Sequence, residues 1–553
     1  MGVAGLIDVS ASSRTRQLLD YLVKLPVKLR NRLSLDAWQK SFYEYLSERR
    51  GHSTPSHRIV LVQCVEDLYY FGLFGQIASS LRERNPIRVE QFVFHSLNLG
   101  ESKSFWVFVK SRLIDNALHN RKWVRLYSSF CDNVGYRSTS FRPIGDVIDL
   151  YRAWICWRNL HDRQALIELA IDGVAVGDLV NDSFLRFKPA ATVALKDVYL
   201  LALIWQAYRD FRRARDYFSR AGPAIFFTSY STYIQHGIAA RVALRCGIQV
   251  FSFGNYQEFS KELSVEDWLH TKNPDNYASD FAKADRSQDK LALAEAALSA
   301  RIAGAIDGAT AYMKRSAYAE SRDPVPDVRG APVVFLHDFY DSPHVYRQVV
   351  FPDFWEWVCF TIDTLKAANI RFFLKPHPNQ VVLNDDVLAE LKHRYPEISL
   401  ISSKITNKQL VEAGLTCAVT VYGTVAHEMA YLGVPTIACA RHPHVSFDFC
   451  RTARSREEYA NALRNCGKMD VDKAQLRQQS LIFYYMHNLN VGDEQKSLRD
   501  IIAKFRLDCS TLDETNMYLV ESLKEISRLP GYEAYLSKWS LGLGEGAQRE
   551  GSG

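Results

Sequence analysis

The sequence lacks the features that would assign it at once to several large classes of protein. Its ten cysteines occur singly, with no Cys-x-x-Cys pair, so zinc ribbons and thioredoxin-type redox motifs have no support. No run reaches the roughly 18 apolar residues that span a bilayer, and the nearest, from Val198 to Ala207, is about half that length. The first residues show no continuous apolar core of a signal peptide. We therefore expect a cytoplasmic protein with reduced thiols.

The excess of positive over negative charge is also small. The chain carries 68 lysines and arginines against 62 aspartates and glutamates, a net charge of +6 over 553 residues. Such a mild excess does not indicate a nucleic-acid binder, so we expect no nucleic-acid partner. The apolar share of 47% and the aromatic share of 12% are those of a folded globular chain. Disordered, collagen-like and coiled-coil chains are thereby excluded.

Proline and glycine are concentrated at a few places and divide the chain into parts. The run ESRDPVPDVRGAP, from Glu320 to Pro332, contains three prolines and a glycine, which resist both helix and strand. We place a domain boundary there. The expected parts are a helical segment at 1–56, an N-terminal domain at 57–325, a C-terminal domain at 326–490, helices at 491–540 that pack across both domains, and a glycine-rich, disordered tail at 541–553.

After the linker, short apolar runs alternate with helical patterns. The expected strands are 333–337, 371–375, 398–401, 417–421 and 436–440, and the expected helices are 354–368, 385–395, 407–413 and 424–432. The first half repeats the pattern around a long helical insertion, with strands expected at 59–64, 89–94, 224–228 and 248–253. Such alternation implies right-handed crossovers and parallel sheets. We therefore predict an α/β protein with two Rossmann-like, doubly wound domains facing a cleft.

Polar residues gather where the predicted strands of the second half end. His337 and Asp338 follow its first strand, the run from Lys375 to Pro378 (KPHP) follows the second, and the run from Tyr422 to Thr424 follows the fourth. Open α/β sheets bind ligands at the carboxyl ends of their strands. We therefore expect these residues to share one rim and to form a ligand site.

The residue types on this rim favour a nucleotide. Gly423 allows a sharp turn into a helix, whose free N–H groups and the Thr424 hydroxyl together form an anion site suited to phosphate. Lys375 and His377 can contact phosphate or stabilise charge on a leaving group. Glu428, one turn into the helix, is within reach of a ribose. Ordinary helix capping by Thr424, a solvated Glu428 and a structural His377 are the alternatives.

The first half offers candidates for acid–base chemistry and for acceptor binding. Asp178 and Asp182 lie in the glycine-entered run GDLVNDS. In the second half, His337 opens a loop with two carboxylates and two histidines. Tyr233 and His236 lie at a strand-to-helix junction, where an acceptor would bind. Helix capping and a hydrated loop are the alternatives for each residue alone. No spacing fixes a metal site, so we expect none.

These motifs resemble those of a known group of enzymes. KPHP followed by YGTVAHEMAYLGVPTIA resembles bacterial surface-polysaccharide glycosyltransferases of the GT-B architecture, in particular the capsule-polysaccharide biosynthesis proteins that use CMP-Kdo. The blocks HDFYDSPHVYRQVVFPDFWEW, GDLVNDSFLR and YIQHGIAARVALRCGIQVF extend the likeness over about residues 165 to 445. The chain is also similar to bacterial sialyltransferases, which pair an HP motif with a hydroxyl-bearing helix start.

The resemblance implies a two-lobed enzyme that takes a sugar from a CMP-linked donor without a metal or another cofactor. Its acceptor would be a lipid-linked glycan of a capsule, O-antigen or lipopolysaccharide. His377 and Pro378 would serve as the HP motif, Thr424 would bind phosphate, and Tyr422 would complete the nucleotide site. A CDP-glycerol-dependent glycerophosphotransferase, a nucleotide-sugar epimerase and a non-catalytic GT-B module of an assembly complex are the alternatives.

A surface for membrane contact is also suggested by the sequence. The stretch from Arg14 to Tyr45 is basic and partly amphipathic, a pattern that can lie on an anionic membrane. We therefore expect the protein to be cytoplasmic and to contact the cytoplasmic face of the inner membrane peripherally. A packed pair of N-terminal helices, interrupted at Pro26, is the alternative.

Overall fold

The computed structural model of the chain describes most of the two halves predicted from the sequence. The described residues are 27, 34–51, 56–94, 116–138, 142–188, 190–255, 257–305, 318, 323–378, 383–469, 471–512 and 518–545. Much of the basic stretch expected to touch a membrane, from Arg14 to Tyr45, lies outside them.

The first lobe is built on a six-stranded sheet with the order β3-β2-β1-β6-β7-β8. All its neighbouring strands are parallel except β8, which runs antiparallel to β7. Every residue of β1 and β6 is buried, as expected for strands covered on both faces. The strands are β1 (Ile59–Gln63), β2 (Arg88–Val93), β3 (Asn133–Arg137), β6 (Ile225–Thr228), β7 (Gln249–Ser252) and β8 (Lys261–Leu263).

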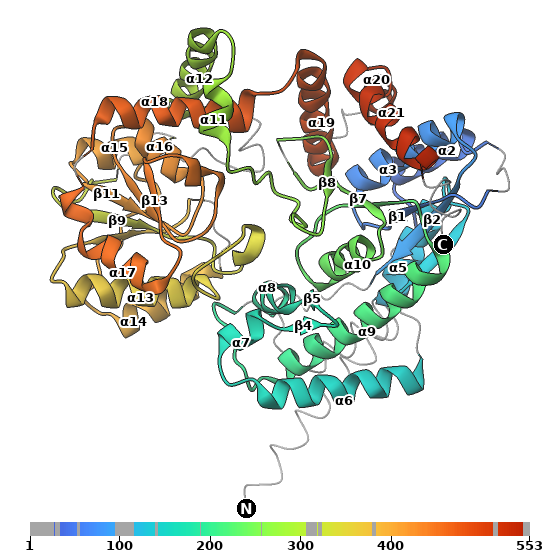
Figure 1. The fold of residues 1–553 in the computed structure, drawn as a ribbon, viewed down its shortest axis with the longest axis horizontal. Helices are drawn as coiled ribbons and strands as arrows, with labels where there is room; N and C mark the ends of the chain where they lie inside the picture. The colour runs from blue at the N-terminus through green and yellow to red at the C-terminus, as the bar shows by residue number, and fades with distance from the viewer. Residues whose placement is uncertain are drawn as a thin grey trace, which may run out of the picture.

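Two groups of helices cover this sheet and form a separate apolar core on each face. One face is covered by α2 (Ala37–Glu48), α3 (Leu68–Arg84) and α5 (Asn116–Tyr127). The other is covered by α6 (Pro143–Asn159), α7 (Arg163–Ile167), α8 (Gly177–Phe187), α9 (Val198–Ala221) and α10 (Ile234–Arg245), with the hairpin β4 (Ala170–Ile171) and β5 (Val174–Ala175). Figure 1 shows α6 at the outer edge of this lobe, below α9.

The second lobe is built on a parallel sheet with the order β10-β9-β11-β12-β13. A bridge between Leu374 and Leu400 adds a sixth position beside β10, so both sheets follow the same Rossmann order. The prediction of an α/β chain with two Rossmann-like sheets is confirmed. The strands are β9 (Pro332–Phe335), β10 (Phe373–Lys375), β11 (Cys417–Val419), β12 (Thr436–Ala438) and β13 (Cys450–Thr452).

The four helices predicted for the second lobe lie close to their expected positions, as α13 (Phe354–Ala367), α14 (Asn384–Arg394), α15 (Asn407–Glu412) and α16 (Val425–Tyr431). The lobe also contains helices that were not predicted, namely η3 (Pro343–Val345), η4 (Pro443–Ser446), α17 (Arg456–Arg464), η5 (Cys466–Lys468), α18 (Lys473–Tyr484) and η6 (Tyr485–Leu489). The strand expected at 398–401 is reduced to the single bridge at Leu400, because only one backbone pair there joins β10.

The chain passes between the lobes twice. The helices α11 (Tyr277–Ala282) and α12 (Ser287–Ile302) precede the proline-rich linker, yet they pack on α18 and α16 of the second lobe. The chain therefore crosses ahead of the expected boundary at 325. After η6 it returns, and α19 (Asp493–Thr511), α20 (Leu519–Ile526) and α21 (Pro530–Glu545) pack beside α2 and α3 (Figure 1).

The last helix completes the core of the first lobe. The Trp539 side chain is fully buried, and its ring lies 5.2 Å from that of Phe227 and 6.0 Å from those of Phe251 and Phe253. The tail expected to be disordered from 541 is instead helical as far as Glu545, because Leu543 is buried in the same core.

The structure also bears on the thiols and on membrane crossing. All ten cysteines are free thiols. Among the described helices, none combines the length and the apolar character needed to cross a bilayer.

Replacing Trp539 by alanine tests the contribution of α21 to the first lobe. We expect the free energy of unfolding to fall by about 3–5 kcal/mol, because a large buried side chain is lost and a cavity remains. Urea denaturation followed by circular dichroism measures the change. Leu541 lies on the same helix with 69% of its surface exposed. The Leu541→Ala control should change stability by less than about 0.5 kcal/mol. Equal losses in the two variants would contradict the packing described.

Candidate active site

The carboxyl ends of β9, β10 and β11 bring several of the predicted nucleotide-binding residues together. Lys375 ends β10 and is almost fully buried, with its ammonium group 5.7 Å from the centre of the Phe335 ring. Burial lowers the pKa of Lys375 to about 8, and the nearby charge of Glu428 partly offsets this. His377 and Pro378 follow in the half-buried loop, where burial lowers the pKa of His377 and the Asp338 carboxylate opposes the shift. The KPHP loop therefore lies on the same rim as Asp338.

The turn that follows β11 lies on this rim as well. Gly423 has a φ of +118°, which favours glycine, and a Cβ placed there would lie 4.0 Å from the His337 ring. Thr424 is half-buried at the start of α16, and its hydroxyl makes no capping hydrogen bond within the described residues. The ring of Tyr422 lies 4.9 Å from that of His337. The structure therefore brings the KPHP loop and the Tyr422–Thr424 turn to the same edge of the sheet.

His337 is placed as a structural residue of this rim. Its ring stacks on Phe354 at 4.5 Å, and its Nε2 lies 3.0 Å from the Thr420 hydroxyl. Burial lowers its pKa to about 3, so it is neutral at physiological pH. These contacts do not fit the catalytic acid–base role expected for His337, because the ring is held by its neighbours.

Glu428 is occupied by partners that lie far away in the sequence. One carboxylate oxygen lies 2.9 Å from the Arg301 guanidinium of α12. The other accepts hydrogen bonds from the Tyr318 hydroxyl at 2.7 Å and the Asn407 amide at 3.3 Å. Glu428 is 3% exposed. The ribose contact expected for Glu428 does not fit this arrangement, because both oxygens already hold α12 and neighbouring segments against the rim.

The two lobes meet through α8, which carries the sequence GDLVNDS. Asp182 of α8 is buried and accepts two hydrogen bonds from His344 of the second lobe, at 2.7 Å from Nδ1 and 3.2 Å from the backbone N–H. Asn181 donates to the carbonyl of Pro352 in the same loop. Burial alone would lower the pKa of His344, but the Asp182 carboxylate outweighs it and raises that pKa. His344 Nε2 has no hydrogen-bond partner within the described residues.

Asp178, the other candidate carboxylate of α8, is not in a comparable position. Arg241 of α10 donates to both of its oxygens, at 2.7 and 2.5 Å, and also to the carbonyl of Ala175. Burial would raise the pKa of Asp178, but Arg241 outweighs it and holds that pKa below its ordinary value. The pair joins two helices within the first lobe, so the catalytic role expected for Asp178 does not fit.

Tyr233 and Asp341 complete the polar cluster between the lobes. Tyr233 precedes α10 with a φ of +62°, an unusual conformation for a residue with a side chain. Burial raises the pKa of its hydroxyl, and the nearby Ser342 side chain opposes this shift. The Asp341 side chain is exposed to solvent, but protein atoms close to its carboxyl group displace part of the water around it. This desolvation raises the pKa of Asp341, while the hydrogen bond from the N–H of Ser342 opposes the shift. Tyr422 donates to the carbonyl of Ser342 at 3.0 Å and links this cluster to the rim.

His236, expected to bind the acceptor, lies beneath the surface instead. Its Nδ1 is 3.0 Å from the Gln63 amide, at the carboxyl ends of the neighbouring strands β1 and β6. Burial lowers its pKa to about 3. The ring packs against Phe94 and Tyr230. A direct acceptor contact therefore does not fit His236, whereas Tyr233 stands at the interface of the lobes.

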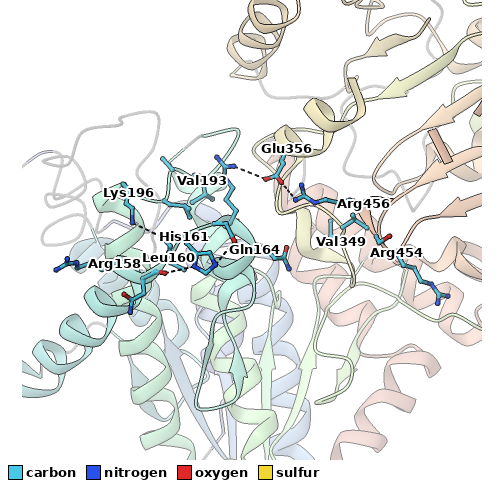
Figure 2. Close-up of a pocket in the computed structure, with 17 residues that line it drawn as sticks. Arg158, Leu160, His161, Gln164, Val193, Lys196, Val349, Glu356, Arg454 and Arg456 are labelled. Carbon is cyan, nitrogen blue, oxygen red and sulfur yellow. Dashed lines mark hydrogen bonds and ion pairs between the residues drawn. The ribbon is translucent and has the colours of Figure 1, made fainter. Parts of the chain in front are cut away.

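A cavity of about 1210 Å³ opens between the lobes at the β13 side of the second sheet. Figure 2 shows its wall of arginine, lysine and histidine side chains from both lobes. Glu356 at the start of α13 pairs with Arg456 of the same lobe and, at 3.5 Å, with Arg163 of the first lobe. None of the site residues predicted from the sequence lines this cavity. It is therefore a second polar feature of the interface, separate from the rim at β9, β10 and β11.

Sequence reasoning missed His344, the partner of Asp182. The signal was present in the run HDFYDSPH, which ends at this histidine, but nothing local shows which of its polar residues faces the first lobe. Within the described residues, no group of three or more His, Cys, Asp or Glu side chains is arranged to hold a metal ion.

Changing Glu428 to glutamine tests whether its role is structural. We expect a loss of about 3–5 kcal/mol in the free energy of unfolding, because Arg301 would remain as a buried charge without its partner. Glu295 pairs with Arg477 on the surface, with side chains 39% and 44% exposed. The Glu295→Gln control should cost less than about 1 kcal/mol. A Glu428→Gln protein that is as stable as the control would restore the ribose contact as an explanation.

Comparison with known proteins assigns no family to the chain. No protein-family model matches it. No curated protein matches it either.

Among solved structures, the chain is similar to the UDP-GlcNAc 2-epimerase of Methanocaldococcus jannaschii in complex with UDP-GlcNAc and UDP. The identity is 9% and the TM-score 0.22, over 74% of this chain and 93% of that chain. It is similar to the UDP-GlcNAc 2-epimerase from Neisseria meningitidis bound to UDP-GlcNAc, at 9% identity and TM-score 0.23, over 85% and 100%. It is also similar to the glycotransferase of kitacinnamycin, at 10% identity and TM-score 0.19, over 88% and 98%. At these identities and scores the likeness assigns no substrate or reaction, and the description of fold and site depends on this chain's own geometry.

Proposed function

We propose that the protein is a glycosyltransferase of the two-lobed GT-B type, which moves a sugar from a nucleotide-activated donor to a hydroxyl group of a glycan. One observation carries the proposal. The rim that holds Lys375, His377 and Gly423 is linked through Tyr422 to the pair formed by Asp182 of one lobe and His344 of the other. In this proposal the rim serves as the anion site and the Asp182–His344 pair supplies an oriented base where the lobes join.

The donor would lie on the second lobe. Its phosphate would sit over Gly423 and the Thr424 hydroxyl, with Lys375 and His377 beside it. Because burial lowers the pKa of Lys375 to about 8, an adjacent phosphate would favour the protonated amine and gain from its charge. These groups would stabilise the negative charge that develops on the departing nucleotide.

The acceptor would be activated by His344. Asp182 accepts the Nδ1 hydrogen bond and so leaves Nε2 as the basic nitrogen, as in other carboxylate–imidazole pairs. The acceptor hydroxyl would transfer its proton to Nε2 while its oxygen bonds to the anomeric carbon. The bond from that carbon to the phosphate oxygen would break, and the nucleotide would leave with the electron pair. The exposed carboxylate of Asp341 would stabilise positive charge on the sugar ring.

The identities of the donor and the acceptor are the first points to test. The motif resemblance favours CMP-Kdo as the donor and a lipid-linked glycan of a bacterial surface polysaccharide as the acceptor. The test supplies CMP-Kdo, CMP-sialic acid, CDP-glycerol and UDP-sugars in turn, with and without acceptor and with and without EDTA, and follows nucleotide release. Release that requires an acceptor and a CMP-sugar supports the proposal. Turnover without acceptor would indicate an epimerase, use of CDP-glycerol a glycerophosphotransferase, and binding without turnover a non-catalytic module.

Variants of the two halves of the site should fail in different ways. His344→Ala should lower kcat by about 10²–10⁴-fold with little change in nucleotide affinity, because it removes the base while the proposed phosphate site lies wholly within the second lobe. Lys375→Met should weaken nucleotide binding, measured by calorimetry, because it removes a charge from the phosphate site. His393→Ala, an exposed histidine of α14, is the control and should behave as the wild type. Loss of nucleotide binding in His344→Ala would contradict the division of roles.

The pH dependence of the reaction should report on the Asp182–His344 pair. His344 must be neutral to accept a proton, and its pKa is raised by Asp182, so kcat/KM should fall as the pH drops through that raised pKa. Asp182→Asn removes the charge that raises the pKa. The acidic limb of the pH profile should therefore move to lower pH, while the plateau falls because the ring loses its orientation. An unchanged limb would exclude His344 as the group that titrates.

A further inference from the structure

The helix α6 buries its acidic residues and exposes an apolar face, which is the reverse of an ordinary surface helix. Its two acidic residues, Asp146 and Asp149, are each 1% exposed and point into the protein. Asp146 pairs with Arg213 of α9 at 3.0 Å, and both aspartates pair with Arg212, at 2.9 and 2.7 Å. Trp205 of the same helix donates to the carbonyl of Asp146. The acidic face of α6 is thus its buried face, fixed by ion pairs to α9.

The opposite face of α6 is apolar and exposed. Ile144 is 80% exposed, Val147 64%, Tyr151 61% and Ile155 39%. Their spacing of three or four residues places them on one continuous stripe along the helix. Soluble proteins expose single apolar residues commonly, but a contiguous stripe of this kind marks a surface that contacts something apolar.

On α6 itself, the exposed charges are all of one sign. Arg152 and Arg158 are exposed, and α6 has no acidic residue on that side because Asp146 and Asp149 are both buried. The guanidinium of Arg158 lies 4.9 Å from the Trp154 ring. Aromatic residues flanked by arginines are typical of helices that lie in the interface of an anionic bilayer. In a two-fold pair of α6 helices, by contrast, the same arginines would face residues of like charge.

The end of α6 leads to the cavity between the lobes. Arg158 and Asn159, the last residues of the helix, line its wall together with Arg163, Lys196 and Arg454 (Figure 2). A bilayer or protein that covers the stripe would therefore lie next to the cationic cavity between the lobes.

We propose that α6 is an interfacial helix that seats the protein on an anionic lipid bilayer. The stripe of Ile144, Val147, Tyr151 and Ile155, with the half-exposed Ile148 beside it, enters the region between headgroups and acyl chains. Arg152 and Arg158 contact the lipid phosphates. The ion pairs with α9 hold the helix rigidly in this orientation. The bilayer contact is a property of the first lobe alone and requires neither donor nor catalysis.

Vesicle binding without any sugar nucleotide tests the proposal separately from the proposed function. Full-length protein is sedimented with vesicles of phosphatidylcholine and phosphatidylglycerol, and with vesicles of phosphatidylcholine alone. The wild type should bind the anionic vesicles more tightly, and added salt should weaken the binding. The double variant Ile144→Gln/Ile155→Gln should bind at least about tenfold more weakly, because two apolar side chains are removed from the contact. Arg152→Glu should reduce the preference for anionic vesicles.

Leu293→Gln is the matched control. Leu293 is 60% exposed on α12 of the other lobe, so the change removes an equally exposed apolar side chain away from α6 and should leave vesicle binding unchanged. Each variant is checked for an unaltered melting temperature. Equal vesicle binding by the wild type and the Ile144→Gln/Ile155→Gln variant would overturn the proposal. A wild type that is dimeric without lipid, and that the double variant makes monomeric, would also overturn it by showing that a second copy covers α6.

Discussion

Asp182 and His344 meet across the boundary between the lobes, and the position of the candidate active site depends on this contact. A buried carboxylate is stable only when partners satisfy it, so Asp182 fixes the loop that carries His344 against α8. The same loop holds Ser342, which contacts Tyr233 of the first lobe and Tyr422 of the rim. This hydrogen-bonded pair, together with the bond from Asn181 to the Pro352 carbonyl, therefore holds the two polar surfaces at a defined distance.

The remaining buried charges divide into structural pairs and a small chemical set. Arg241 with Asp178 and Arg301 with Glu428 are closed pairs that join separate elements. Lys375 differs because desolvation lowers its pKa and the nearby Glu428 is already held by Arg301. A buried amine in that state gains most from an anion placed beside it, which is the property expected of a phosphate site.

The sequence predicted the two sheets and the shared rim because the signals for them are local. Apolar runs alternating with helical spacing locate the strands, and parallel pairing then brings Lys375 and Gly423 to one edge. The partners of Asp182 and Glu428 were not predictable, since they lie 162 residues away at His344 and beyond the linker at Arg301. The orientation of α6 was hidden for a similar reason. Periodicity shows that one face is apolar, but only the ion pairs to α9 show that it points outward.

The two crossings of the chain make the lobes interleaved in sequence. A fragment that begins at residue 326 would contain every strand of the second sheet but would lack α11 and α12. Glu428 would lose its ion pair with Arg301, and the apolar surfaces of Tyr431 and Tyr484 would be uncovered. Independent folding of this half therefore requires a fragment that starts before Tyr277, and recombination between related chains at the proline-rich linker would separate α12 from the rim it supports.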